Sequence, residues 1–208
     1  AVREAGATAA TVAIRDGRIL VGLDETMLQT LATTEGVRKV ARPTLAGALT
    51  AGGWGATTVS ATMLAAHAAG IRVFATGGIG GVHPGAFEPS AGPDNEIRPP
   101  TLDVSVDLEE LARTPVVVVC AGPKAILDVP ATLEVLESRG VPVVAIGTAE
   151  LPGFFSRHSG IPAPQSVPDE AAAAALAATH LALLGGGVLV CVPVPEADEL
   201  PRSEAVEA

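Results

Sequence analysis

A run of apolar residues without alternation constrains the fold of this chain more than any other feature. Residues 115–124 read Pro-Val-Val-Val-Val-Cys-Ala-Gly-Pro-Lys. A strand in which every residue is apolar is covered on both faces, which is typical of a parallel sheet between helices. Ala121-Gly122-Pro123 then break the strand, and Lys124 follows. We therefore predict a buried strand at 116–120 that places Lys124 at the carboxyl end of a sheet.

Other apolar segments alternate with helical ones along the chain. Strands are predicted at 9–14, 18–21, 71–75, 141–146 and 188–192 in addition to 116–120. Helices are predicted at 24–34, 44–51, 60–69, 107–113, 130–138 and 168–184. This alternation predicts an α/β fold with a mostly parallel β-sheet covered by helices on both faces, a three-layer α/β/α arrangement. We expect one domain at residues 1–195 and a frayed acidic tail at 196–208.

The amino-acid composition limits the kinds of function that this protein can have. The 208 residues are 48% hydrophobic but only 2% aromatic, so the core must be aliphatic. The net charge of −10 argues against a nucleic-acid-binding surface. There is no signal sequence and no apolar run of membrane-spanning length, so we expect a cytoplasmic protein without membrane association. Cys120 and Cys191 lie in apolar runs and are interpreted as small core residues.

Lys124 is the first candidate for chemistry. Ligands of open α/β sheets bind at the carboxyl ends of the strands. We expect Lys124 to be partly desolvated there, which would lower its pKa and make the amine nucleophilic. The alternative is an ordinary surface lysine that follows a strand.

Two further segments suggest ligand binding. Thr76-Gly77-Gly78-Ile79-Gly80-Gly81 follows a strand and offers closely spaced backbone N–H groups that suit a phosphate; a plain glycine-rich turn is the alternative. In Asp103-Val104-Ser105-Val106-Asp107, an extended backbone would place Asp103, Ser105 and Asp107 on one side, where they could bind a hard divalent cation. Alternatively, Asp107 simply caps the helix that follows.

Basic and histidine residues give weaker signals. Lys39 and Arg42 could bind a phosphate, although two basic residues at a turn are usually solvated. The histidines lack the paired spacing of a zinc site. Ser156 and His158 lie too close in sequence to suggest a hydrolase triad, and no nucleophile-elbow motif is present.

Taken together, the segments resemble the pseudouridine-5′-phosphate glycosidase (indigoidine synthase A-like) family from about residue 5 to about residue 195. The longest matching block is 70–83, Gly-Ile-Arg-Val-Phe-Ala-Thr-Gly-Gly-Ile-Gly-Gly-Val-His. Other matching stretches are 10–14, 17–19, 21–23, 39–40, 55–63, 107–108, 111–116, 119–122, 124, 126–128, 155–157, 159–160 and 185–190.

The resemblance implies a lyase or hydrolase reaction in pseudouridine catabolism. In that family the C–C glycosidic bond of pseudouridine 5′-phosphate is cleaved reversibly to uracil and ribose 5-phosphate, through an imine between a lysine and the ring-opened ribose. The matching lysine is Lys124. The resemblance also implies Mn²⁺ held by Asp103 largely through water, and assembly as a homotrimer. The implied substrate-binding residues are Lys39, Val59, Thr76, Ser105, Val106 and Asp107.

The chain also departs from the family pattern. The family's general-acid glutamate and an asparagine near the uracil belong to segments without a counterpart in residues 1–208. Pro84 replaces an arginine, and Pro123 replaces an alanine. Two alternatives therefore stay open: a non-catalytic ribose-phosphate-binding relic or regulatory subunit of the same fold, and an unrelated Schiff-base aldolase built around Lys124.

Overall fold

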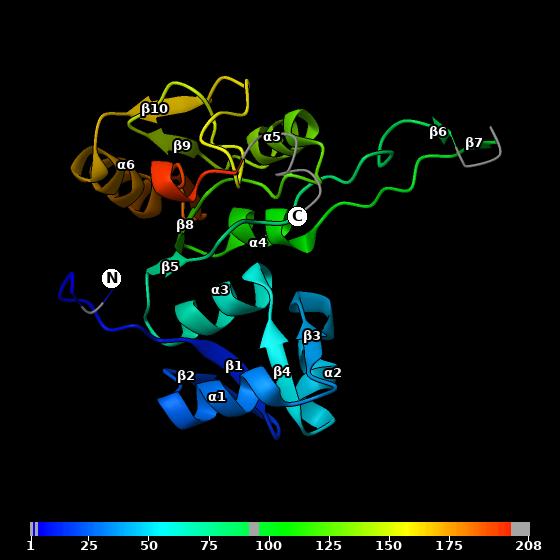
Figure 1. The fold of residues 1–208 in the computed structure, drawn as a ribbon, viewed down its shortest axis with the longest axis vertical. Coiled ribbons are helices and arrows are strands. Elements are labelled where there is room, and N and C mark those ends of the chain that lie inside the picture. The colour runs from blue at the N-terminus through cyan, green and yellow to red at the C-terminus, as the bar shows by residue number, and fades with distance from the viewer. Residues whose placement is uncertain (1, 3, 92–95, 201–208) are drawn as a thin grey trace. The chain divides into compact units, whose positions relative to one another are not determined.

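The computed structural model describes residues 2, 4–91 and 96–200, and its contacts divide the chain into two compact units (Figure 1). The first unit covers residues 1–72 and the second covers residues 73–208. Each unit is described by itself below. The single domain expected at 1–195 stays a prediction, and residues 201–208 of the expected acidic tail lie outside the described residues.

The first unit contains a mixed sheet in the order β2-β1-β4-β3. Its strands are β1 (Val12–Arg15), β2 (Arg18–Val21), β3 (Arg38–Val40) and β4 (Trp54–Thr57). β1 is antiparallel to β2 and β4, whereas β3 is parallel to β4. The strands predicted at 9–14 and 18–21 are found as β1 and β2, which form a hairpin. Asp16 and Gly17 both have positive φ values, 47° and 80°, as a tight two-residue turn requires.

Three helices complete the first unit. They are α1 (Glu25–Thr33), α2 (Leu45–Thr50) and α3 (Val59–Ala68), with a short 3-10 helix η1 (Arg42–Thr44) before α2. Asp24 caps α1, because its carboxylate accepts the Met27 N–H at 2.7 Å. The core of this unit is aliphatic, as the scarcity of aromatic residues predicts; one cluster of its buried residues consists of Ile14, Val40, Ala48 and Ala61.

The second unit is built on a five-stranded sheet in which every pairing is parallel, in the order β10-β9-β11-β8-β5. The bounds are β5 (Val73–Ala75), β8 (Val117–Cys120), β9 (Val143–Ile146), β10 (Gln165–Val167) and β11 (Val188–Cys191). The valine run forms β8, between β11 and β5, with Val118 completely buried. The predicted α/β class with a mostly parallel sheet is therefore confirmed.

The helices of the second unit are α4 (Val106–Arg113), α5 (Val129–Ser138) and α6 (Glu170–Leu183). A 3-10 helix η2 (Glu196–Asp198) follows β11, and a two-stranded ribbon of β6 (Ser90–Ala91) and β7 (Ile97–Arg98) lies within the connection at 84–100, here called the 84–100 loop. Asp128 and Asp169 cap α5 and α6 through their carboxylates. No helix in the described part of the chain is long and apolar enough to cross a membrane.

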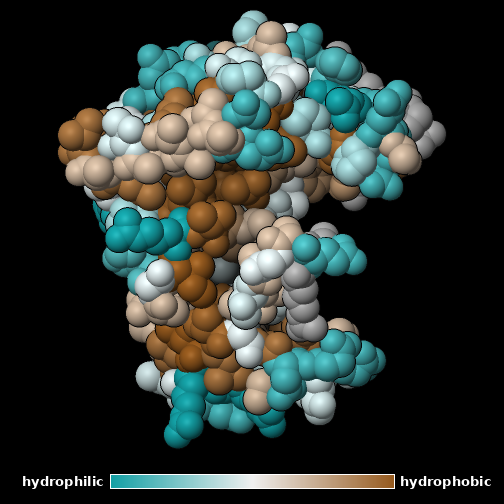
Figure 2. Space-filling view, turned by 90° about the vertical axis from the view of Figure 1, so that its left-hand side faces the viewer, coloured by the Kyte–Doolittle hydropathy of each residue, from teal (hydrophilic) through white to brown (hydrophobic). Residues whose placement is uncertain are grey.

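Helix α6, predicted at 168–184, is an apolar segment that is not buried over most of its length. Only Ala173, Ala177 and His180 are buried, and Leu183 is 75% exposed near the end of the helix. Figure 2 faces this side of the second unit and shows tan and brown residues across its surface. An alanine-rich helix has little hydrophobic contrast between its faces, so composition could not reveal which face is covered.

Candidate active site

Two segments meet at the carboxyl edge of the parallel sheet. Residues 76–83, here called the glycine loop, follow β5, and residues 121–124 follow β8. The Ala121 N–H donates to the Gly77 carbonyl at 2.9 Å. Further along, the Lys124 N–H donates to the Ile79 carbonyl at 3.2 Å. The parallel pairing of β5 with β8 thus continues past the strand ends and holds the lysine segment against the glycine loop.

Lys124 lies where the sequence predicts, directly after the strand, but its side chain is exposed. The expected partial desolvation is therefore not present. The turn that carries the lysine is nevertheless well defined. Cys120 Sγ accepts the Gly122 N–H at 3.3 Å, and Gly122 has a φ of 102°, a conformation that favours glycine. The backbone at the lysine is fixed while its amine stays open to a ligand.

The cysteine prediction is confirmed. Cys120 and Cys191 are free and buried, and they face each other in the pairing of β8 with β11. The hydrogen bond with Cys120 and burial raise the pKa of Cys191. Both residues therefore act as small core residues beneath the lysine turn.

The glycines of the glycine loop are required by close neighbours rather than by backbone conformation. Gly78, Gly80 and Gly81 do not have positive φ values. A Cβ on Gly80 would overlap Ser105 Oγ and lie 2.6 Å from Ser105 Cβ, while a Cβ on Gly81 would lie 2.9 Å from Thr132 Cγ2. The loop is therefore packed so tightly against the starts of α4 and α5 that no side chain fits.

Most amides of this loop bind protein acceptors. The Gly80 N–H donates to Asp107 Oδ2 at 3.0 Å, and the Val82 N–H donates to Thr132 Oγ1 at 2.9 Å. Three further backbone N–H groups, which belong to Thr76, Ile79 and His83, donate to backbone carbonyls. Within the described residues, the amides of Gly77, Gly78 and Gly81 have no acceptor. The loop is thus a partly filled nest of backbone amides, in which the amides of Gly77, which is exposed, and Gly78, which is buried, have no protein acceptor.

The segment 103–107 lies along the same loop. The His83 N–H donates to the Asp103 carbonyl at 3.0 Å, and the Ser105 N–H donates to the Gly81 carbonyl at 2.9 Å. Ser105 is the N-cap of α4, accepting the Asp107 N–H at 3.3 Å. The alternative in which Asp107 is the cap is therefore wrong. Asp107 is buried in the first helical turn, where its carboxylate binds the glycine loop.

The three residues of the predicted cation site differ in exposure. Asp103 is exposed, Ser105 is half-buried, and Asp107 is buried and already accepts a hydrogen bond. No group of three or more His, Cys, Asp or Glu residues suitable for a metal occurs in the described chain. A lone exposed carboxylate fits only an ion that keeps most of its water ligands.

The remaining predicted substrate-binding residues are Val106, Lys39 and Val59. Val106 is half-buried at the first position of α4. Lys39 and Val59 belong to the first unit. Lys39 is exposed on β3, whereas Val59 is buried at the first position of α3. A ligand contact at Val59 would therefore have to use the backbone.

A loop at 151–160, which contains the family-matching residues 155–157 and 159–160 but received no functional role from the sequence, also contacts the glycine loop. Phe154 lies against Gly78, and its N–H donates to the Ala121 carbonyl at 3.0 Å. Phe154 and Phe155 pack edge to face, with ring centroids 4.2 Å apart. Adjacent phenylalanines in a chain with only 2% aromatic residues were the signal that could have identified this loop.

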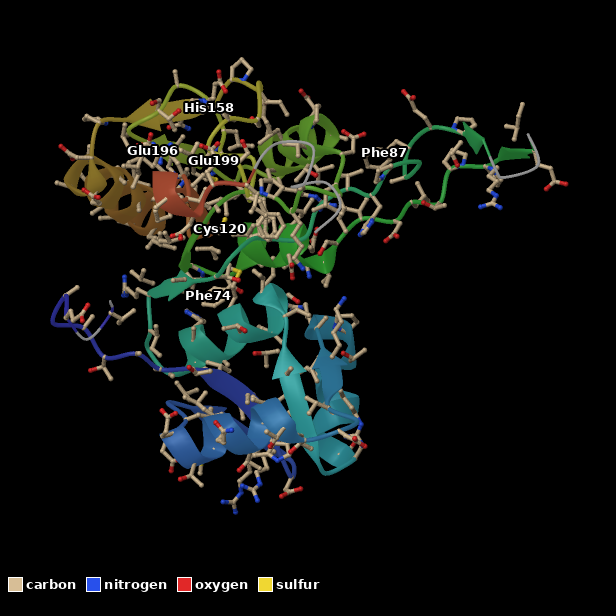
Figure 3. All side chains as sticks on the ribbon, viewed as in Figure 1. Phe74, Phe87, Cys120, His158, Glu196 and Glu199 are labelled. Atoms are coloured by element: carbon tan, nitrogen blue, oxygen red, sulfur yellow. The ribbon has the colours of Figure 1, made fainter. Side chains whose placement is uncertain are left out.

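The first residues of the predicted frayed tail are fixed to this loop. Glu199 accepts the Arg157 N–H at 2.8 Å and the Ser156 hydroxyl at 3.2 Å, and the Leu200 N–H donates to the Phe155 carbonyl at 2.9 Å. The labels in Figure 3 place Glu196 and Glu199 on the same turn, with His158 nearby. The backbone N–H of Arg157, and after it the Ser156 hydroxyl, hold the pKa of Glu199 below its usual range.

The lowered pKa gives a pH prediction. A carboxylate with a lowered folded-state pKa stabilises the fold above its unfolded-state pKa, and this contribution disappears as the pH falls through the folded-state value. Wild type is therefore expected to be more stable than Glu199→Gln at pH 7, and the difference should shrink below the ordinary glutamate pKa of about 4.3. Urea unfolding of both proteins between pH 3 and pH 7 measures this difference.

Glu196→Gln is the matched control, because Glu196 is exposed on the same turn. Its stability difference from wild type should stay small over the same pH range. Parallel pH profiles for wild type and Glu199→Gln would contradict the assignment of Glu199 as the residue that fixes the tail.

Comparisons with known proteins agree with this architecture. The family model described as "Indigoidine synthase A like protein" matches residues 1–208. The chain is 57% identical to a pseudouridine-5′-phosphate glycosidase from Methylobacterium nodulans over 98% of its own length, and 53% identical to one from Paracoccus denitrificans over 99%. It spans 57% and 65% of these two relatives, which is less than two thirds of each.

Two solved structures are also similar. The prealnumycin C-glycosynthase AlnA in complex with ribulose 5-phosphate has a TM-score of 0.86 and 39% identity, covering 97% of this chain and 63% of that one. An indigoidine synthase A-like protein from Thermotoga maritima has a TM-score of 0.83 and 36% identity, with coverages of 97% and 64%. The chain therefore belongs to the indigoidine synthase A-like family, the family whose resemblance its sequence predicts.

Proposed function

We propose that this chain provides the lysine-bearing part of a pseudouridine-5′-phosphate glycosidase, which cleaves the C–C glycosidic bond to give uracil and ribose 5-phosphate. The observation that carries the proposal is Lys124: its backbone is fixed against the glycine loop, and its amine is exposed at the carboxyl edge of the sheet. The identity of more than 50% to glycosidases supports this reaction.

In the proposed reaction, Lys124 Nζ bonds to C1 of the ribose and loses a proton, while the bond from C1 to the ring oxygen breaks and that oxygen keeps the electron pair and takes up a proton. The bond from C1 to uracil then breaks, and its electron pair passes to the uracil carbon, which takes up a proton. The imine left on the lysine is hydrolysed by water, which releases ribose 5-phosphate. Lysine suits this role because the lone pair of its nitrogen forms the C=N bond of the imine as the bond from C1 to uracil breaks.

The other predicted residues have binding roles in this proposal. Thr76, with the free amides of Gly77 and Gly78, would receive the phosphate, and the 105–107 segment would contact the sugar. Lys39 and Val59 remain proposed substrate-binding residues. Asp103 would hold Mn²⁺ largely through water, and the ion would supply positive charge close to the substrate when bound. Homotrimer formation also remains a proposal, which light scattering coupled to size-exclusion chromatography can test.

Borohydride trapping tests the proposal directly. Lys39 and Lys124 are the two lysines of the chain, so a trapped sugar has few alternative amines. The protein is incubated with ribose 5-phosphate and Mn²⁺, reduced, digested and analysed by mass spectrometry. We expect a sugar-phosphate adduct on the peptide that contains Lys124, and none on the peptide that contains Lys39.

A second candidate is a ribose-phosphate-binding protein without turnover. The exposure of Lys124 favours it, because an amine that is open to solvent lacks the desolvation that activates a catalytic lysine. Ribose 5-phosphate binding without an adduct on Lys124 would select this candidate. An adduct together with uracil release from pseudouridine 5′-phosphate would exclude it.

A further inference from the structure

Two successive backbone hydrogen bonds, through Ala121, connect Phe154 to the glycine loop. Its N–H donates to the Ala121 carbonyl at 3.0 Å, and the Ala121 N–H donates to the Gly77 carbonyl at 2.9 Å. The neighbouring Pro152 carbonyl lies 2.6 Å from the place where a Cβ on Gly122 would be. The 151–160 loop is therefore built tightly onto the turn that separates it from the glycine loop.

The phenylalanine ring also contacts the glycine loop directly. A Cβ on Gly78 would lie 2.5 Å from Phe154 Cε2 and 2.9 Å from the Gly122 carbonyl oxygen. A Cβ on Gly77 would lie 3.8 Å from the same ring carbon. Because Gly78 has no positive φ, it is the ring and this carbonyl that require glycine at this position. The ring thus fixes the backbone at the two residues whose adjacent amides are free.

The conformation of Phe154 costs energy. Its φ of 70° is in the left-handed region, which is unfavourable for a residue with a bulky side chain. Such strain persists only where the surroundings enforce it. Here the Gly153 N–H donates to the Ser156 carbonyl at 2.9 Å, and Glu199 holds Ser156 and Arg157 from the tail. These contacts hold the ring against the glycine loop.

We propose that Phe154 is a positioning residue for the anion-binding backbone of Gly77 and Gly78. This inference rests on the proposed function, in which that backbone receives the phosphate of the sugar. Backbone amides bind an oxyanion well only when they are held in the direction of the anion, and the ring restricts the two peptide groups that carry them. The ring itself need not contact the substrate.

Calorimetric titration of the 208-residue protein with ribose 5-phosphate tests the proposal. Phe154→Ala is expected to weaken binding about tenfold, which corresponds to about 1.4 kcal/mol. Phe154→Gly removes the ring but accommodates the positive φ, so it should weaken binding equally while unfolding less readily than Phe154→Ala. Phe154→Tyr keeps the ring and should retain the affinity. Phe87→Ala is the matched control, because Phe87 is 49% exposed on the 84–100 loop (Figure 3).

Two readouts separate positioning from loss of structure. Hydrogen exchange of the peptide that covers residues 76–83 should accelerate in Phe154→Gly, while exchange in β8 and β11 stays unchanged. Borohydride trapping with ribose, which lacks the phosphate, should give the same yield in wild type and in Phe154→Gly. A purely structural defect would also change these controls.

The outcomes distinguish the two proposals. Equal affinity of wild type and both ring-deleted variants for ribose 5-phosphate would overturn the role of Phe154 alone. Weakened binding in the variants, without any adduct on Lys124 in wild type, would overturn the glycosidase reaction alone. If wild type bound neither ribose 5-phosphate nor inorganic phosphate, both proposals would fail.

Discussion

Replacing Lys124 with alanine is expected to abolish the borohydride adduct and to reduce uracil release from pseudouridine 5′-phosphate by roughly 10⁴-fold or more. The reason is chemical, since no other side chain at the carboxyl edge of the parallel sheet can form an imine with C1 of the sugar in this proposal. Because the Lys124 side chain is exposed, the free energy of unfolding should change by no more than about 0.5 kcal/mol. Uracil release and urea unfolding are the two measurements.

Lys124→Arg refines this experiment. Arginine keeps the positive charge, but its guanidinium is never deprotonated in proteins and forms no imine. It should therefore be as inactive as alanine while retaining affinity for ribose 5-phosphate. Lys39→Arg is the control for the other lysine and should keep the adduct on Lys124. Substantial activity in either Lys124 variant would contradict the proposed role of the lysine.

Replacing Gly80 with alanine is expected to destabilise the protein by about 1–3 kcal/mol, the usual cost of overpacking a tight site. The new methyl group would overlap Ser105 Oγ and lie 3.0 Å from Asp107 Oδ2. It would therefore displace the start of α4 and weaken the hydrogen bond between the Gly80 N–H and Asp107. The urea midpoint should fall, and affinity for ribose 5-phosphate should fall with it.

Two further variants test whether the clash with Ser105 causes the loss of stability in Gly80→Ala. Gly47→Ala lies in α2 with no atom within 4 Å of the added carbon, so it should be neutral or slightly stabilising. Adding Ser105→Gly to Gly80→Ala removes the overlapping side chain, and glycine is tolerated at an N-cap. The double variant should recover part of the lost stability. If the two changes were simply additive, the clash with Ser105 would not be the reason for the loss.

Hydrophobic patterning made most of the second unit predictable. The unalternating valine run became β8, and predicted helices such as 130–138 and 168–184 were found within two residues at each end. The strands β3 and β10 were missed because they are only three residues long and carry polar side chains. Their strand conformation comes from pairing with β4 and β9, which a local pattern does not encode.

The candidate site was only partly predictable. The positions of Lys124 and of the glycine loop followed from the order of strands and turns. The roles of Ser105 and Asp107 did not, because either residue could have capped α4 on local grounds. The folded structure shows which of the two residues is the cap. The Asp107 carboxylate binds the Gly80 N–H, and Ser105 caps α4. The relation of Phe154 to Gly78 joins residues far apart in the sequence, and no spacing rule reaches that far.

The sequence by itself determined the α/β class, the family and the placement of Lys124 after a buried strand, because these follow from local hydrophobic patterns and contiguous motifs. The tertiary structure alone decided which amides of the glycine loop are free, that Lys124 is exposed, and that Glu199 holds the 151–160 loop. These properties depend on close packing and hydrogen bonding between distant segments, which are fixed only when the chain has folded.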